Sequence, residues 1–424
     1  MDVKTTKNLG KLIALSLITS TVLHATNGDN LIATGVKARG MGGTSIAVSH
    51  GAESGLANAA LITNTEGTEI TFGGTIFMPD IQTSLNTNPL APLPPQGSYT
   101  SDADLSMIPE VSIAHKIDDN WYIGIGMWGT AGMGTDYSGT QNMSIGNLGN
   151  MDMVTNLQLM QFGVPIAYKT GGLSLAVTPI VQYGNLDINY HMPDMSDPSI
   201  IYNIGAGVAQ DFGFGWNLGV AYDFSANGVD GLTLGAIYKS SIEMDYTNQL
   251  TTAVGAMGLA LPHGDTLEQP EEYGVGIAYQ MGQHTFAFDY KKINWSDSKG
   301  YGDFGWDDSN VYAFGYAYTE NEWTIRLGYN HADTAVVEIA GGDTNYGVAA
   351  LNFFNLLGFP ANAEDHYTIG ATYAFTNSFS LDLAYVYADD TSDTFKTAGL
   401  MMGIDSVTTS HSEDSISFQL AYKF

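Results

Sequence analysis

Large apolar residues alternate with small or polar ones over the last ten positions of this 424-residue chain. Positions 416, 418, 420, 422 and 424 carry Ile, Phe, Leu, Tyr and Phe, and the positions between them carry Ser, Gln, Ala and Lys. A period of two predicts a β-strand with one apolar face.

The same alternation recurs about fourteen times after residue 67. In one segment Trp216, Leu218 and Val220 alternate with Asn217 and Gly219. The predicted strands are 68–77, 105–116, 120–130, 155–169, 173–189, 204–224, 231–246, 270–281, 284–297, 310–319, 322–333, 364–376, 378–390 and 412–424.

The connections between these strands alternate between short and long. Short connections include 118–119, 170–172 and 282–283, and the long ones are 78–104, 131–154, 190–203, 247–269, 298–309, 334–363 and 391–411. This alternation is typical of an up-and-down barrel in the outer membrane. A last strand that ends on an aromatic residue, here Phe424, is also typical of such barrels. We therefore predict an all-β fold, a 14-stranded antiparallel transmembrane β-barrel over residues 68–424, in the cell outer membrane of a Gram-negative bacterium.

The composition agrees with a barrel and excludes several other classes. Hydrophobic residues make up 44% of the chain, yet no mature segment reaches the run of about 20 apolar residues that a membrane helix needs. A net charge of −30 argues against a nucleic-acid partner, because phosphates require Lys and Arg. The absence of Cys excludes disulfides and thiolate chemistry. Acidic residues such as Asp307, Asp308 and Asp389 fall in loops, where they predict a solvated face, with a calcium site as the alternative.

The N-terminal 67 residues divide into two parts. Residues 1–25 have the basic start and the short apolar core of a signal peptide, with Ala25 as the cleavage position. Residues 26–67 are rich in Gly and Ala and do not alternate. About forty exported residues before the first strand predict a plug, or hatch, inside the lumen, and the alternative is a free periplasmic tail. We expect Lys37 and Arg39 of this segment to meet carboxylates of the lumen.

Several motifs, taken in order, resemble the FadL-type hydrophobic-compound transporters of the outer membrane. The opening motif is Ala38-Arg39-Gly40-Met41-Gly42-Gly43. It is followed by Asn58-Ala59-Ala60, where the family usually has Asn-Pro-Ala, so the fixed turn of a proline is lost. Further matching stretches are 121–134, 164–169, 235–240, 289–290, 295–296, 326–329, 359–361 and 366–370.

The resemblance implies a monomer sealed by a hatch that includes Asn58. It implies passive uptake of hydrophobic small molecules such as long-chain fatty acids or aromatic hydrocarbons, with outer-membrane lipid and lipopolysaccharide as surroundings. It also implies a kinked third strand that opens the wall sideways into the bilayer. The predicted third strand carries Gly124, Gly126 and Gly129, and glycine in a strand often marks a bulge. The alternative is that these glycines make room for the plug.

Two long loops are rich in apolar residues. Exposed apolar patches usually mark binding sites, so we predict that these loops form a groove that captures the ligand. The alternative is that the loops pack on each other as a cap. The residues concerned are Phe353, Phe354, Leu356, Leu357 and Phe359 in one loop and Val254, Met257 and Leu261 in the other.

A few charged residues are expected to point into the lumen by alternation. Arg326 is a candidate ligand-binding residue, because a guanidinium fits a carboxylate. The alternative is a charge network that braces the wall, with Glu110, Glu243 and Asp289. His366 also faces inward, but no nucleophile motif accompanies it, so we predict no catalytic residue, no metal, no cofactor and no enzyme. An open porin for polar solutes and a surface adhesin are the rival functions, and the sequence leaves the ligand open among fatty acid, alkane and aromatic compound.

Overall fold

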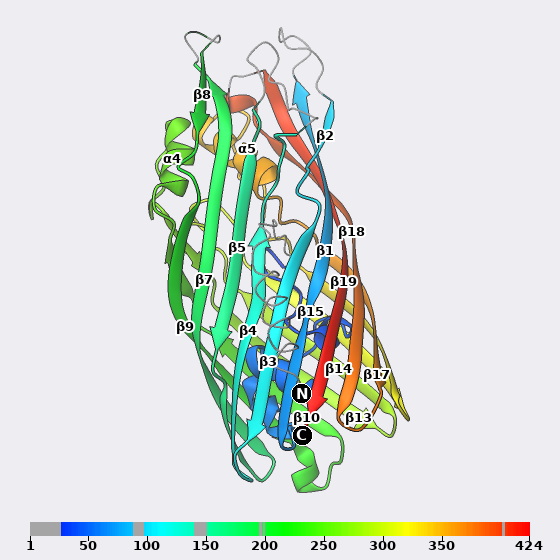
Figure 1. Ribbon diagram of the computed structural model, residues 1–424. Coiled ribbons are helices and arrows are strands. Elements are labelled where there is room, and N and C mark those ends of the chain that lie inside the picture. The colour runs from blue at the N-terminus through cyan, green and yellow to red at the C-terminus, as the bar shows by residue number, and fades with distance from the viewer. Residues whose placement is uncertain (1–26, 88–96, 140–150, 195–196, 198–199, 401–402) are drawn as a thin grey trace, which may run out of the picture.

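The computed structural model describes residues 27–87, 97–139, 151–194, 197, 200–400 and 403–424, so the predicted signal peptide lies outside the described residues. The strands form one closed antiparallel barrel of fourteen strands (Figure 1). The first strand pairs with the last from Glu69 opposite Lys423 to Thr87 opposite Ile404, and this pairing closes the cylinder. The predicted fold class is therefore confirmed.

The wall strands follow one another in chain order around the barrel. Because β5 and β6 together occupy one place in the wall, the strands listed here make fourteen positions. They are β1 Thr68–Thr87, β3 Ser106–Lys116, β4 Trp121–Met133, β5 Val154–Gly163, β6 Ile166–Thr170, β7 Leu173–Pro193, β9 Ala209–Asp223, β10 Leu232–Lys239, β13 Glu272–Met281, β14 His284–Ile293, β15 Ser309–Glu320, β16 Trp323–Ala332, β17 Asp365–Ala374, β18 Phe379–Lys396 and β19 Ile404–Lys423.

The alternation in the sequence corresponds to the two faces of the wall. Trp216, Leu218 and Val220 are each about 40% exposed on the outer face, whereas inward-pointing residues such as Gln182 and Asp289 are buried. An apolar outer face suits lipid, and polar inner side chains suit a filled lumen. None of the helices among the described residues is long and apolar enough to cross a membrane.

Short elements complete the fold at both ends and inside. β2 Ser98–Thr100 pairs with β1, and β8 Ile201–Ile204 pairs with β7, at the upper end in Figure 1. The helices are α2 Val36–Arg39, η1 Gly51–Glu53, α3 Ser54–Ala57, η2 Ala59–Asn64, η4 Phe224–Asn227, α4 Gln249–Ala256, α5 Tyr346–Gly358 and η5 Ala398–Leu400. Thus the loops predicted at 247–269 and 334–363 each contain a helix.

Several predicted boundaries were wrong. β1 continues ten residues beyond the predicted end at residue 77, and β18 and β19 extend into the predicted loop 391–411. The predicted strand 231–246 is two strands, because β11 Ile242–Asp245 leaves the wall and pairs with β12 Thr266–Gln269 in a separate sheet. As a result Glu243 does not point into the lumen; its side chain is 56% exposed and pairs with Lys299.

Candidate functional site

The N-terminal segment, residues 27–67, lies inside the barrel and contacts widely separated wall strands. The backbone N–H groups of Ser45 and Ile46 donate to the Asp289 carboxylate on β14 at 2.7 and 2.9 Å. The Asn58 side-chain amide donates to the Val220 carbonyl on β9 at 3.0 Å. Because these strands stand on different parts of the wall, the segment spans the lumen.

Glycine lets this segment approach the wall closely. The φ angle of Gly42 is +67°, a conformation that favours glycine, and its N–H donates to Thr368 Oγ1 on β17 at 2.9 Å. A Cβ atom on Gly42 would come within 2.7 Å of the Tyr329 and Phe314 backbones. Close packing of the segment against the wall therefore explains why the motif is rich in glycine.

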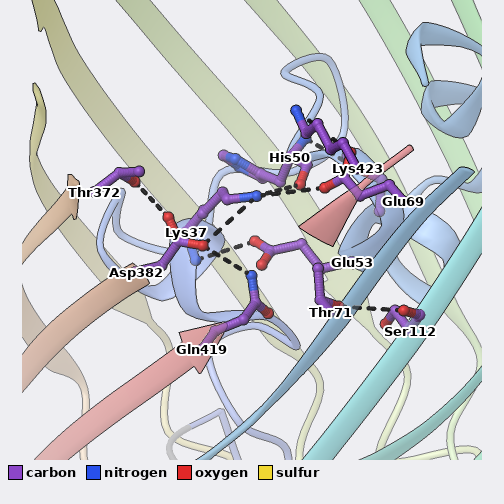
Figure 2. A network of polar contacts seen from close by, with 12 residues as sticks. Lys37, His50, Glu53, Glu69, Thr71, Ser112, Thr372, Asp382, Gln419 and Lys423 are labelled. Carbon is purple, nitrogen blue, oxygen red and sulfur yellow. Dashed lines mark hydrogen bonds and ion pairs between the residues drawn. The ribbon is translucent and has the colours of Figure 1, made fainter. Parts of the chain in front are cut away.

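The basic residues of the segment pair with carboxylates of the wall, and Figure 2 shows the contacts of Lys37. Lys37 Nζ lies 3.7 Å from Glu69 and 3.8 Å from Asp382. Arg39 forms an ion pair with Glu110, and its Nη1 donates to Thr75 Oγ1 at 2.8 Å. Removing one partner of a buried pair typically destabilises a protein by about 3–5 kcal/mol, because the remaining charge is left without a partner. These pairs therefore hold the segment in register with the wall.

Glu53 gives this anchoring a dependence on pH. Its Oε1 accepts the N–H groups of Lys37 and Ala38, and burial raises its pKa from 4.5 to about 7. A carboxyl group with a raised pKa stabilises the folded state fully below its ordinary pKa, and that contribution is lost as the pH rises through the raised value. We expect hydrogen exchange at the Lys37 and Ala38 amides, corrected for intrinsic rates, to accelerate between pH 4.5 and about 7.

Glu53→Gln is the matched variant, because Gln cannot ionise. It should flatten this part of the exchange profile, whereas an unchanged profile would assign the pH dependence to another group. His50 acts in the opposite sense, since burial lowers its pKa to about 3 and its protonation destabilises the segment at low pH. Only the difference between the two proteins therefore reports on Glu53.

The wall is interrupted between β3 and β4. The two strands pair from Lys116 opposite Tyr122 up to Glu110 opposite Trp128, and above this point β3 pairs with β1 and β4 pairs with β5. The register of β4 against β5 shifts between Gly129 and Ala131. Of the three candidate glycines only Gly129 lies at this break, whereas Gly124 and Gly126 pair regularly with β3.

The start of the N-terminal segment covers the edge of β4 that β3 leaves. Leu31 N–H donates to the Thr130 carbonyl at 3.1 Å, and Gly132 N–H donates to the Asp29 carbonyl at 2.9 Å. The Asp29 carboxyl is buried and accepts hydrogen bonds from Tyr301 and from Gln269. Figure 1 shows the upper end of β4 at mid-height of the barrel. The interruption is therefore closed from inside by the backbone of residues 27–31.

Apolar side chains fill both sides of this interruption. On the inside, Ile108 of β3 clusters with Leu31 and Phe77, and Trp128 is buried with its Nε1 donating to Ser112 Oγ at 2.8 Å. On the lipid side, a hollow of about 110 Å³ is lined by residues that include Met107, Pro109 and Met127. An apolar path across the wall would therefore pass beside Ile108.

The apolar loop residues pack together over the upper lumen. All five candidate residues on or beside α5 are buried, and they share one cluster with Val254 and Met257, against which Leu261 packs. Polar bonds fix α5 to the wall: Thr409 and Thr135 donate to the carbonyls of Leu356 and Leu357, each at 2.9 Å. The five candidate residues on or beside α5 are Phe353, Phe354, Leu356, Leu357 and Phe359. The loops are thus closed on each other as a cap in this structure.

A small cavity lies between the N-terminal segment and the wall. Its volume is about 70 Å³, and Leu31, Leu56 and Thr130 line one side of it. Lys239 and Lys291 line another side and share the Glu272 carboxylate, with Nζ to Oε1 distances of 3.1 and 3.9 Å. This cavity combines apolar residues beside the β3–β4 interruption with a buried ion cluster.

Comparison with known proteins identifies the family. The model of the family described as outer membrane protein transport protein (OMPP1/FadL/TodX) matches residues 17–424. The chain belongs to this family.

Its relatives cover most of its length at low identity. A 47 kDa outer membrane protein of Pasteurella multocida is 22% identical over 370 residues, which are 81% of this chain and 82% of that protein. The long-chain fatty acid transport protein of Salmonella typhi is 23% identical over 374 residues, which are 78% of this chain and 80% of that protein. This member of the OMPP1/FadL/TodX family is an outer-membrane protein, as the sequence predicted.

Solved structures show the same fold. The P. putida toluene transporter TodX has a TM-score of 0.66 at 18% identity, with 92% of this chain and 99% of that chain covered. A Pseudomonas aeruginosa FadL homologue has a TM-score of 0.68 at 14% identity, with 94% of this chain and 100% of that chain covered. At these identities the likeness supports the plugged barrel architecture and leaves the ligand open.

Arg326 lies apart from the other candidate ligand residues of this family member. It follows Trp323 at the start of β16, next to a short turn, whereas α5 follows the far end of β16. Its guanidinium faces a cavity at the short-turn end of the barrel. The sequence grouped Arg326 with the loop residues, and the structure does not.

Some residues of the site carried no signal in the sequence. Ile108, Asp29 and Leu31 belong to ordinary apolar or mixed stretches, and only the fold brings them to the β3–β4 interruption. Trp128 could have been noticed as a single large side chain among glycines. Within the described ranges, no group of three or more His, Asp or Glu side chains has the geometry to hold a metal ion.

Proposed function

We propose that this protein is a channel for the passive uptake of hydrophobic small molecules across the outer membrane. The observation that carries the proposal is the β3–β4 interruption, which has an apolar lining on both sides and only a short backbone segment behind it. The names of the relatives agree, since they include a long-chain fatty acid transport protein and a toluene transporter. The ligand class is thus a long-chain fatty acid or a hydrocarbon.

In this proposal the ligand first enters the apolar cap formed by the loops. The cap places five buried apolar residues of one loop against Val254 and Met257 of another, so a hydrophobic ligand would replace side-chain contacts with similar ones. Met is suited to this exchange because it is flexible and polarizable. The ligand then moves down past Leu31 and Ile108 and leaves sideways into the bilayer beside Gly129. Of the three candidate glycines only Gly129 lies at the interruption, because Gly124 and Gly126 pair with β3.

Gly129 is the position at which a substitution tests the lateral exit most directly. A Cβ atom there would overlap Cγ2 of Ile108, a side-chain end that can move, whereas a Cβ atom on Gly126 would overlap the Trp128 ring. Gly129→Val should therefore fill the passage without displacing the ring. We expect uptake of dodecanoate and of toluene into proteoliposomes to slow by about tenfold, equivalent to about 1.4 kcal/mol of barrier.

Two further variants control this experiment. Gly97→Val is the matched control, because a Cβ atom on Gly97 meets nothing within 4 Å, and it should transport normally. Ile108→Ala should accelerate uptake, because it widens the same passage. Full uptake by Gly129→Val would count against an exit at this place, and faster uptake of a sugar than of dodecanoate by the native protein would favour the porin alternative.

A further inference from the structure

A second cavity lies at the opposite end of the lumen from the cap. Its volume is about 450 Å³, and it lies between the N-terminal segment and the turn that joins β17 to β18. Its lining includes Lys37, Glu69, Arg326 and Lys423 together with Ser and Thr side chains. Thr376, Asn377 and Lys423 at its rim are exposed, so the cavity opens to solvent on the side of the short turns.

The charge of this lining is opposite to that of the chain. Three cations, Lys37, Arg326 and Lys423, line the cavity together with one carboxylate, Glu69. His50 also lines it, and burial lowers the pKa of His50 to about 3, so that its imidazole is neutral near pH 7. The whole protein carries a net charge of −30, and a cationic lining is therefore a local exception.

The carboxylates nearby leave Arg326 without an ion pair. Glu69 lies between Lys37 and Lys423, with oxygen to Nζ distances of 3.7 and 3.6 Å, and Asp382 lies 3.8 Å from Lys37 (Figure 2). Arg326 is 8% exposed, and its Nη1 donates to Thr372 Oγ1 at 2.6 Å. Across the described part of the chain, no carboxylate forms an ion pair with Arg326.

An arginine has five N–H donors in a planar fork, which suits two oxygens of a carboxylate or phosphate group. The bond to Thr372 uses one of these donors, and the cavity is the open space in front of the guanidinium. The hydroxyl groups of Ser378 and Ser380 line the same space and can donate as well, whereas the Ser49 hydroxyl donates to the Leu61 carbonyl at 3.1 Å. The lining therefore offers one small anion a bidentate guanidinium group, a second cation and neutral hydroxyl donors.

We propose that this cavity binds a small oxyanion, a carboxylate or a phosphate, with Arg326 as the bidentate donor and Lys423 as the second cation. The bound anion would link the N-terminal segment, through Lys37, to strands β16 and β19 of the wall. The site is separate from the hydrophobic pathway, because it lies below the N-terminal segment and has a polar lining. It does not depend on the proposed uptake function.

Titration calorimetry of the full-length protein in a neutral detergent tests the proposal. Sodium phosphate and sodium acetate are titrated at constant ionic strength against a sodium chloride blank. We expect saturable binding of at least one of them, weakened about tenfold or more by Arg326→Gln, which is about 1.4 kcal/mol. Arg326→Lys should restore part of the affinity, and Lys423→Gln should weaken binding less than Arg326→Gln.

Lys116→Gln is the matched control, because Lys116 also lies at this end of the barrel but pairs with Asp119 at 2.9 Å outside the cavity. It should bind the anion normally. Heat-modifiable migration on gels shows whether each variant has folded. If octanoate displaces the bound phosphate, the site also accepts a carboxylate ligand. If octanoate leaves the phosphate bound, the ligand is a free inorganic anion. No heat above the chloride blank, or equal affinity in folded Arg326→Gln, would overturn the proposal.

Discussion

Deletion of residues 26–60 should open the lumen and raise the ion conductance of the protein in a planar bilayer by about tenfold or more, because an unplugged lumen of this size is a water-filled channel. In the native protein these residues span the lumen from β14 to β9 and bury Arg39, Glu53 and Asn58 against the wall. The first and last strands of the wall, β1 and β19, pair with each other directly, so the deleted residues are not part of the pairing that closes the cylinder.

The deletion should also make the channel selective for cations. It removes Lys37 and Arg39, so that Asp382 and Glu110 of the wall face water without these partners. It also removes the Ser45 and Ile46 N–H groups that donate to Asp289. Reversal potentials in a salt gradient measure this selectivity. The full-length protein in the same bilayer is the control, and heat-modifiable migration on gels checks the barrel. An unchanged conductance would mean that the segment does not seal the lumen.

The double change Phe353→Ser and Phe354→Ser should weaken the binding of hydrophobic ligands by an order of magnitude or more, equivalent to at least about 1.4 kcal/mol. The two rings are 4% and 1% exposed, and Phe354 stacks on Phe304 with ring centres 5.4 Å apart. Burial of each ring is worth about 1.5–3 kcal/mol, so the change removes much of the apolar surface of the cap. The barrel should remain folded, because the strands pair independently of α5.

Trp295 and Trp306 belong to the same apolar cluster and can report on binding. Quenching of tryptophan fluorescence by brominated dodecanoate and by iodobenzene measures the affinity for an acyl chain and for an aromatic ring. Phe375→Ser is the matched control, because Phe375 is 53% exposed at the other end of the barrel. If quenching survives in the double variant while heat-modifiable migration is lost, the cluster is a structural cap and capture occurs elsewhere.

The sequence predicted the wall well because every wall strand repeats the same local rule. Lipid outside and a filled lumen inside require alternation at each position, so the pattern can be read without knowing which strand pairs with which. Family membership also followed from short ordered motifs such as 38–43. The charges of Lys37 and Arg39 predicted carboxylates on the facing wall, because a cation buried in the lumen needs an opposite charge beside it.

The fate of the strand predicted at 231–246 shows where local pattern is insufficient. Ile242 and Met244 continue the alternation of β10, but their side chains are 3% and 1% exposed inside the apolar cluster rather than in lipid. A period of two is the same for a strand in the wall and for β11, which pairs with β12. Only the position of the partner strand decides whether such a segment joins the wall or pairs in a separate sheet.

The sequence by itself determined the number of wall strands and the family to which the chain belongs, and it predicted a lumenal N-terminal segment and a glycine-rich third strand. The tertiary structure alone decided that β3 and β4 separate above Trp128, that residues near Asp29 and Leu31 cover the exposed edge, and that Arg326 faces a cavity at the far end from α5. The physical reason is that alternation and glycine content are properties of one strand, whereas pairing, closure and burial depend on segments that are distant in the chain.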